Sequence, residues 1–219
     1  MKKLVAAMLC LTLSLMCAVG LANEKIDPSE LQIGVIMIGD TSDMGFNYSH
    51  LVGLQEMQKN LGIEDHQITI LENVADDSTC ADAISELISN GCNVIIGNSF
   101  GFQTYMYEAA AQHPEVLFCH YSGLLQNDTN FCRFNARNYQ TRYLQGIAAA
   151  MRSESGKIGF VGAFKNAEVN VSLNAYALGA QSVNPDVTVY VKYTNSWYDP
   201  DGETAAANAL IDLGCDVIC

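Results

Sequence analysis

Apolar residues along this chain fall into two alternating patterns, and their order predicts an α/β fold. Unbroken runs rich in Ile, Val and Leu are typical of strands that are buried on both faces of a parallel sheet. They occupy residues 32–38, 67–72, 93–97, 116–120 and 130–134. Between these runs apolar side chains recur at helical spacing, over residues 47–61, 79–89 and 101–112. Strands that alternate with helices across short polar turns predict a doubly wound parallel sheet.

The second part of the chain repeats the pattern of the first. Three pairs of segments match in the same order: QIGVIMIG at 32–39 with KIGFVGAF at 157–164, ITILENV at 68–74 with VTVYVKY at 187–193, and LISNGCNVIIG at 87–97 with LIDLGCDVIC at 210–219. The offset stays between 119 (187 against 68) and 125 (157 against 32). One α/β unit therefore occurs twice, and two such units facing each other predict a binding cleft.

The same periodicities predict two lobes. In the second part they give helices at 140–152, 168–181 and 201–213 and strands at 157–162, 187–193 and 216–219. We expect an N-terminal lobe over residues 23–136 and a C-terminal lobe over 137–219. The crossing near Asn135–Asn138 contains no Pro-, Gly- or Ser-rich linker, which favours a hinge strand over a loose tether. The second lobe is expected to be incomplete, because the chain stops inside a predicted strand.

Residues 1–22 have the pattern of a secretory signal peptide. Lys2 and Lys3 precede an apolar stretch that ends in the small-x-small triplet Gly20-Leu21-Ala22. We therefore expect an exported protein that is periplasmic or associated with the cell envelope. Lipid attachment at Cys17 is the alternative, but Met16 is larger than the residue that usually precedes such a cysteine, so a cleaved product is favoured.

Charge and cysteine content exclude several classes of function. Eleven basic residues against 24 acidic ones give a formal net charge of −13, and without a basic stripe such a surface repels nucleic acid. Six cysteines follow the predicted leader, in no spacing typical of a zinc or redox motif. Cys119 and Cys132 lie on successive predicted strands and could form a disulfide if those strands are neighbours. The favoured interpretation is that the six are small buried apolar residues, with this one disulfide as an option.

Candidate binding residues gather where predicted strands end. In open parallel sheets ligands bind outside the carboxyl ends of the strands. Those ends carry residues 40–47, 98–102 and 120–123 in the first lobe, and 164–166 and 195–199 in the second. These segments are rich in aromatic rings together with Asn, Ser and Asp. That combination predicts a flat ligand with polar edges, because rings stack on its faces and polar groups bond to its rim.

Five motifs in this order resemble the basic membrane protein (BMP) family of substrate-binding proteins of ABC transporters. They are SDMGFNYSH at 42–50, GNSFGFQ at 97–103, RNYQTRYLQG at 137–146, KIGFVGAF at 157–164 and VNPDVTVYVKYTNSWYDP at 183–200. The resemblance covers the chain from about Leu31 onward. It implies a type I periplasmic-binding-protein fold, a purine nucleoside held between aromatic rings as the ligand, and the membrane permease of an ABC importer as the partner.

By position, the resemblance also implies nine contact residues. Asp43 and Asn47 correspond to polar contacts to the ligand, and Phe46 to a stacking ring. Trp197 corresponds to an aromatic side chain supplied by the second lobe. The full implied set is Asp43, Phe46, Asn47, Ser99, Phe100, Tyr139, Gln140, Trp197 and Asp199. The family's remaining second-lobe contacts are expected beyond Cys219.

Several of these residues have an alternative structural role. Asp43 is also well placed to cap the helix that begins near Phe46, and capping and ligand contact do not exclude each other. Phe46 could instead pack the start of that helix onto the core. Of Phe100 and Phe102, only one can face a cleft from a short turn. A core role for Trp197 is disfavoured, because it lies among polar residues after a strand.

The leading functional hypothesis is an exported solute receptor with no catalytic residue, cofactor or metal ion. The alternative of an α/β hydrolase finds no GxSxG, GxxxxGK[ST], HExxH or GxGxxG motif, and only His120 among the histidines follows a strand. A ligand-sensing module of a signalling protein is a third reading. Within the receptor class a sugar or another small polar ligand is the runner-up, since aromatic rings stack on pyranoses as well as on bases.

Overall fold

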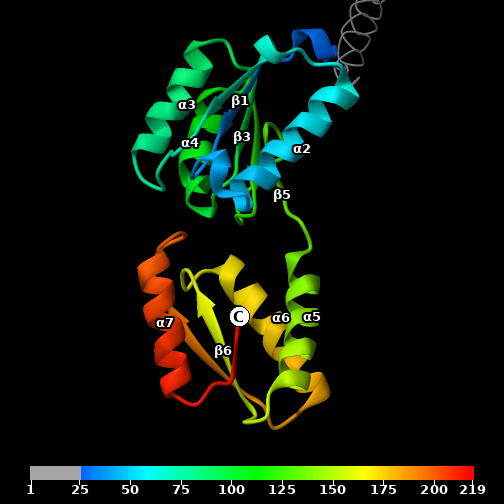
Figure 1. The fold of residues 1–219 in the computed structure, drawn as a ribbon. Coiled ribbons are helices and arrows are strands. Elements are labelled where there is room, and N and C mark those ends of the chain that lie inside the picture. Colours follow the sequence, from blue (N-terminus) through cyan, green and yellow to red (C-terminus); the bar gives the residue numbers. More distant parts are fainter. Residues whose placement is uncertain (1–25) are drawn as a thin grey trace, which may run out of the picture.

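The computed structural model describes residues 26–219, so the predicted signal peptide lies outside the described residues. These residues form two parallel sheets that are covered by helices and connected along one side of the molecule (Figure 1). The first lobe contains strands β1 (Ile33–Ile36), β2 (Ile68–Leu71), β3 (Val94–Gly97), β4 (Leu117–Tyr121) and β5 (Phe131–Phe134), with helices α2 (Phe46–Leu61), α3 (Thr79–Ser89) and α4 (Gln103–Gln112). The second contains β6 (Lys157–Gly162), β7 (Thr188–Tyr193) and β8 (Val217–Ile218), with α5 (Asn138–Arg152), α6 (Ala167–Val183) and α7 (Pro200–Asp212).

The predicted α/β architecture is confirmed, and most element bounds agree within two residues. The strand order of the first sheet is β2-β1-β3-β4-β5, and every described pair is parallel. The helix predicted at 101–112 begins later, at Gln103, because Phe100–Phe102 form a 3-10 turn instead. Its Gly101 packs too closely on the side chain of Asp76 for any larger residue.

Strand β1 shows why the first sheet is buried on both faces. Ile33, Val35 and Met37 pack with Leu54 of α2 on one side. Ile36 belongs to a separate cluster with α3 and α4 on the other side. Figure 1 shows α2 on one face of the sheet and α3 and α4 on the opposite face. A strand covered twice must be apolar at successive positions, which accounts for the unbroken run in the sequence.

The second sheet repeats the central order of the first. Its strands run β7-β6-β8, which matches β2-β1-β3 when each repeat is numbered from its own start. Gly91 and Gly214 end the equivalent helices with the same φ of 89°, a left-handed value that suits glycine. In both copies the next amide donates back to a helix carbonyl, that of Leu87 or Leu210. The duplication inferred from the sequence thus extends to the turn geometry.

Helices α5 and α6 cross at unusually short distance because each carries a glycine at the contact. A Cβ atom added to Gly146 would collide with the carbonyl oxygen of Tyr176, and one added to Gly179 with that of Tyr143. The two glycines therefore let the backbones touch. This pair covers one face of the second sheet, and α7 covers the other (Figure 1).

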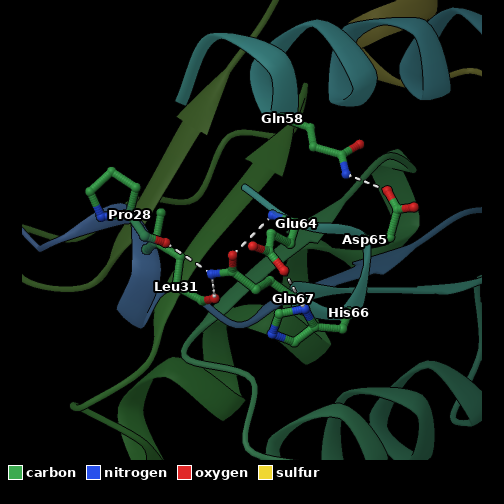
Figure 2. Close-up of polar contacts among 7 residues, drawn as sticks. All are labelled: Pro28, Leu31, Gln58, Glu64, Asp65, His66 and Gln67. Carbon is green, nitrogen blue, oxygen red and sulfur yellow. Dashed lines mark hydrogen bonds and ion pairs between the residues drawn. The ribbon is translucent and has the colours of Figure 1, made fainter. Parts of the chain in front are cut away.

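A buried glutamine fixes the segment that leads into β1. The side-chain amide of Gln67, which is 5% exposed, donates to the carbonyls of Pro28 (2.9 Å) and Leu31 (2.7 Å). Its side-chain oxygen accepts from the backbone N–H of Glu64 at 3.0 Å. Figure 2 shows these bonds converging on one side chain. The polar lead-in is thereby held at the amino ends of the strands, far along the sheet from their carboxyl ends.

The chain passes from the first lobe to the second between β5 and α5 (Figure 1). Tyr121 at the end of β4 and Asn138 at the start of α5 are joined across this crossing, where the Asn138 amide donates to the Tyr121 hydroxyl at 2.9 Å. Within residues 26–219 no helix has both the length and the apolar character that crossing a membrane requires.

Candidate functional site

A cavity of about 180 Å³ lies between the two lobes, next to the crossing. Phe100 and Ser122 line it from loops at the carboxyl ends of β3 and β4. Tyr139 lines it from the start of α5, and Glu168 and Val171 line it from the first turns of α6. The cavity therefore lies where the sheet topology places binding sites, and both lobes contribute to its wall.

Ser122 and Glu168 bring the lobes into polar contact at this cavity. The Ser122 hydroxyl donates to a carboxylate oxygen of Glu168 at 3.1 Å. Burial raises the pKa of Glu168; the Ser122 hydroxyl acts in the opposite direction, and the negative charge of Asp76 adds to the rise. A carboxylate that is largely removed from water and has one hydroxyl partner retains unused acceptor capacity.

A second contact between the lobes joins equivalent positions of the two repeats. The indole N–H of Trp197 donates to the carboxylate of Asp76 at 2.8 Å. Asp76 follows β2 and Trp197 follows β7, the matching strand of the second repeat. The Trp197 ring also packs edge-on against Phe164, with 5.0 Å between ring centroids. Asp76 lies against Gly101, the neighbour of Phe100, so this contact adjoins the cavity wall.

The predicted contact Asp43 caps helix α2. Its carboxylate accepts from the backbone N–H groups of Gly45 (2.9 Å), Asn47 (2.8 Å) and Tyr48 (3.0 Å). Desolvation acts to raise the pKa of Asp43, but these hydrogen bonds outweigh it and lower the pKa to about 2. The structural alternative named for this residue is therefore present.

Asn47 belongs to the same network and is buried. Its side-chain amide donates to Asp43 at 2.9 Å, and its side-chain oxygen accepts from the amide of Asn98 at 2.9 Å. Asn98 in turn accepts from the backbone N–H of Ile38 at 3.0 Å. These bonds tie the loop after β1 to the loop after β3, so Asn47 braces the carboxyl edge of the first sheet.

Phe46 lies in an aromatic cluster near the crossing. Its ring contacts His50 (4.7 Å between centroids) and Tyr121 (5.7 Å), both edge-on, and Tyr121 contacts Phe134 at 5.6 Å. Phe46 is 42% exposed, so one part of the ring packs on the lobe and another is open. The ring does not line the cavity of about 180 Å³.

Ser99 and Phe100 take different positions although they are neighbours. Ser99 is 3% exposed, and its carbonyl accepts from Nε2 of the fully buried His120 at 2.7 Å. This bond assigns the proton of the neutral ring to Nε2, and burial lowers the pKa of His120. The half-buried Phe100 lines the cavity, whereas Phe102 is fully buried in the core. Only one of these two rings faces the cleft, as the spacing predicts.

The remaining predicted residues are spread around the cleft. Tyr139 lines the cavity and is 44% exposed, and its neighbour Gln140 is exposed on α5. Trp197 is half-buried in the contact with Asp76. Asp199 caps α7 through a bond from the N–H of Gly202 at 3.0 Å. Of the predicted set, the structure thus places Phe100 and Tyr139 on the cavity.

Sequence reasoning missed Glu168 and Asp76. Glu168 lies in the first turn of α6, the helix that follows the predicted cleft segment 164–166, so extending that segment by one helical turn would have included it. Ser122 lies inside the segment 120–123 but was not singled out. Asp76 sits in a polar turn after β2 with no motif to mark it. No group of three or more potential metal ligands occurs in the part of the chain that the structure describes.

Comparison with known proteins assigns the family. The sequence profile described as ABC transporter substrate-binding protein, PnrA-like (Bmp) matches residues 30–219. The chain belongs to this Bmp family. The match includes both lobes and the cavity between them, and it confirms the resemblance found in the sequence motifs.

Individual relatives agree on the class and differ in the solute. The chain is 40% identical over 197 residues to a purine-binding protein of Brucella abortus, covering 90% of this chain and 54% of that protein. It is 39% identical over 184 residues to a putative ABC transporter glucose-binding protein of Haloferax volcanii, covering 84% of this chain and 46% of the relative. This Bmp-family chain thus spans about half the length of these relatives.

A solved structure supports the fold. A solute-binding protein of an ABC transporter system from Aeropyrum pernix superimposes with a TM-score of 0.73 at 19% identity, over 86% of this chain and 54% of that one. The fold is that of a periplasmic binding protein, as the resemblance implied. Binding proteins of this family act typically in the periplasm or outside the cell.

Proposed function

We propose that this Bmp-family protein captures a nucleoside-like solute between its two lobes and presents it to the permease of an ABC importer. The observation that carries the proposal is the cavity whose wall comes from both lobes. A solute held there contacts both lobes at once, so its binding favours the closed arrangement over an open one. The segment at 135–137, between β5 and α5, serves as the hinge.

The lining of the cavity fits a flat ligand with polar edges. Phe100 and Tyr139 offer ring surface, and Ser122, Asn138 and Glu168 offer hydroxyl, amide and carboxylate groups. In this proposal Glu168 accepts hydrogen bonds from ligand hydroxyls, which would satisfy the acceptor capacity that Ser122 leaves unused. Phe46 packs on Tyr121 beside the crossing, Trp197 lies in the contact with Asp76, and Asp43 and Asn47 brace the loop after β1.

Charge favours a neutral ligand over a phosphorylated one. Two carboxylates, Glu168 on the cavity wall and Asp76 beside it, outnumber the one guanidinium on that wall, which belongs to Arg133 and donates to the carbonyl of Gly123 at 3.3 Å. The whole chain has a formal net charge of −13. A phosphate group placed beside two carboxylates would be repelled, whereas ribose hydroxyls would be bonded. We therefore expect this protein to bind nucleosides and not nucleotides.

A sugar is the second candidate, because one relative of nearly equal identity is named as a putative glucose-binding protein. The relative named as a purine-binding protein favours a ligand with a purine ring, and a relative from Lactococcus lactis, 29% identical over 180 residues, is named as a nucleoside-binding protein. A hexose offers the same hydroxyl donors to Glu168 but has no base to stack on Phe100. Both candidate ligands would thus bond to Glu168, and only a nucleoside would also stack on Phe100.

A thermal-shift panel separates these candidates. Purified protein is heated with adenosine, guanosine, inosine, adenosine monophosphate, ribose or glucose, and each compound is recovered afterwards for product analysis. We expect at least one nucleoside to raise the melting temperature in a concentration-dependent way and to be recovered intact. A shift with glucose alone would show that the ligand is a sugar and not a nucleoside. Cleavage of a nucleoside would show that the protein is an enzyme and not a receptor.

A further inference from the structure

Two cysteines face each other across neighbouring strands of the first lobe. In the β4–β5 ladder Cys119 is the direct register partner of Cys132. Their Sγ atoms are 3.4 Å apart. Neighbouring strands lie about 4.8 Å apart, a spacing within the range of Cα separations that disulfides span, about 4.4–6.8 Å. The condition set at the sequence level, that the two strands are neighbours, is therefore met.

The two thiols differ in access. Cys132 is exposed on the edge strand β5, and Cys119 is half-buried on β4. Burial raises the pKa of Cys119 to about 12, and the adjacent Cys132 acts in the same direction. Of the other four cysteines in residues 26–219, Cys80, Cys92 and Cys215 are buried and Cys219 is half-buried. Only this pair combines an exposed sulfur with a second sulfur in contact.

We infer that Cys119 and Cys132 form a disulfide bond that joins β4 to the edge strand β5. The inference is independent of the solute. The export predicted for this chain would bring both thiols into an oxidising compartment, where such bonds persist. The bond would fasten the last strand of the first sheet, which leads directly into the crossing at 135–137.

The oxidant is a disulfide donor, and the exchange is balanced. The Cys132 thiolate attacks the donor disulfide and releases one donor thiolate, leaving a mixed disulfide on Cys132. The Cys119 thiolate then attacks the Cys132 sulfur and releases the second donor thiolate. Two protein thiols lose two protons and two electrons, and one donor disulfide becomes two donor thiols. Attack begins at Cys132 because its sulfur is the one that a donor can reach.

Peptide mapping after oxidation tests the inference. Purified protein is treated with glutathione disulfide at a mildly alkaline pH, remaining thiols are alkylated in denaturant so that buried cysteines also react, and non-reduced peptides are identified by mass spectrometry. We expect a cross-linked peptide pair joining Cys119 to Cys132, lighter by two hydrogens than the two free peptides. The other four cysteines of residues 26–219 should be alkylated. The melting temperature should rise on oxidation and fall again with dithiothreitol.

Two single-cysteine variants make the result specific. In Cys119→Ser the glutathione adduct should remain trapped on Cys132, because no second thiol displaces it. In Cys132→Ser the thiol count and the melting temperature should not respond to oxidation. The inference is overturned if wild-type protein keeps both thiols alkylatable, or if Cys132 carries stable glutathione in wild-type protein as well. A cross-link between any other pair would also overturn it. The wild-type map decides alone if a variant does not fold.

Discussion

At the scale of single residues, the stability of the fold and the proposed binding role make opposite demands on Glu168. Its carboxylate lies in the contact between the lobes with one hydroxyl partner, Ser122. Because burial raises the pKa of Glu168, folding disfavours its charged form. Its contribution to stability is therefore largest below the unfolded pKa and decreases as the pH rises through the two values. Residues that cost stability in a ligand cavity are typical of binding sites.

Replacing Glu168 by Gln should separate the two effects. The neutral amide removes a buried charge, so the melting temperature at pH 7 should stay the same or rise. Affinity for the nucleoside should fall about tenfold, because a charged acceptor is exchanged for a neutral one. Calorimetric titration measures the affinity, and Glu56→Gln on the exposed side of α2 is the control. Unchanged affinity in Glu168→Gln would remove Glu168 from the site.

Asp43→Asn tests the capping role of a residue that was predicted to bind the ligand. Losing the charged acceptor of three backbone N–H groups should lower the free energy of unfolding by about 1 kcal/mol at pH 7. The pKa of Asp43 is lowered from 3.8 to about 2, so its contribution is complete above 3.8 and is lost as the pH falls toward 2. Chemical denaturation at several pH values should show the gap closing in that range. Lost affinity at unchanged stability would instead make Asp43 a ligand contact.

The residues that sequence reasoning found and missed differ in how they reach the cleft. Phe100 lies three residues after the end of β3, so the topology alone places it at the carboxyl edge. Glu168 and Asp76 arrive through a helical turn and a polar loop, and their positions depend on how the second lobe sits against the first. No local pattern encodes that arrangement. Sequence reasoning therefore identifies the edge of each sheet more readily than the contacts between the two.

At the scale of elements, hydrophobic periodicity predicted nearly every helix and strand. It succeeds because the central strands are covered on both faces and the helices on one, which imposes distinct spacings. The last strand was predicted at 216–219 and is paired at Val217–Ile218. The close crossing of α5 and α6 could not be predicted, since a glycine within a helix gives no sign of what it faces.

Two glycine-to-alanine substitutions should have opposite effects. In Gly179→Ala the new methyl group meets the Tyr143 carbonyl, and the helices must separate at a cost of about 1–3 kcal/mol. Gly53 lies within α2 with open space around it, so Gly53→Ala should stabilise the protein by about 0.5–1 kcal/mol. Urea denaturation measures both. Equal changes in the free energy of unfolding for the two substitutions would show that α5 and α6 tolerate a wider spacing.

At the scale of the whole molecule, duplication gives the cleft its internal symmetry. The strand orders β2-β1-β3 and β7-β6-β8 place Asp76 and Trp197 after equivalent strands, and these two residues meet each other between the lobes. Relative motion of the lobes must change the surroundings of Trp197, which is the only tryptophan in the chain.

Tryptophan fluorescence thus tests most directly whether a solute is captured between the lobes. Nucleosides and glucose are titrated into wild-type protein and into Asp76→Ala, which lacks the acceptor of the indole N–H, with free N-acetyltryptophanamide as the control for absorbed light. We predict a saturable change in Trp197 emission with a nucleoside and none with glucose, and a different starting emission in the variant. Emission that no nucleoside alters, while the melting temperature also stays constant, would contradict the account.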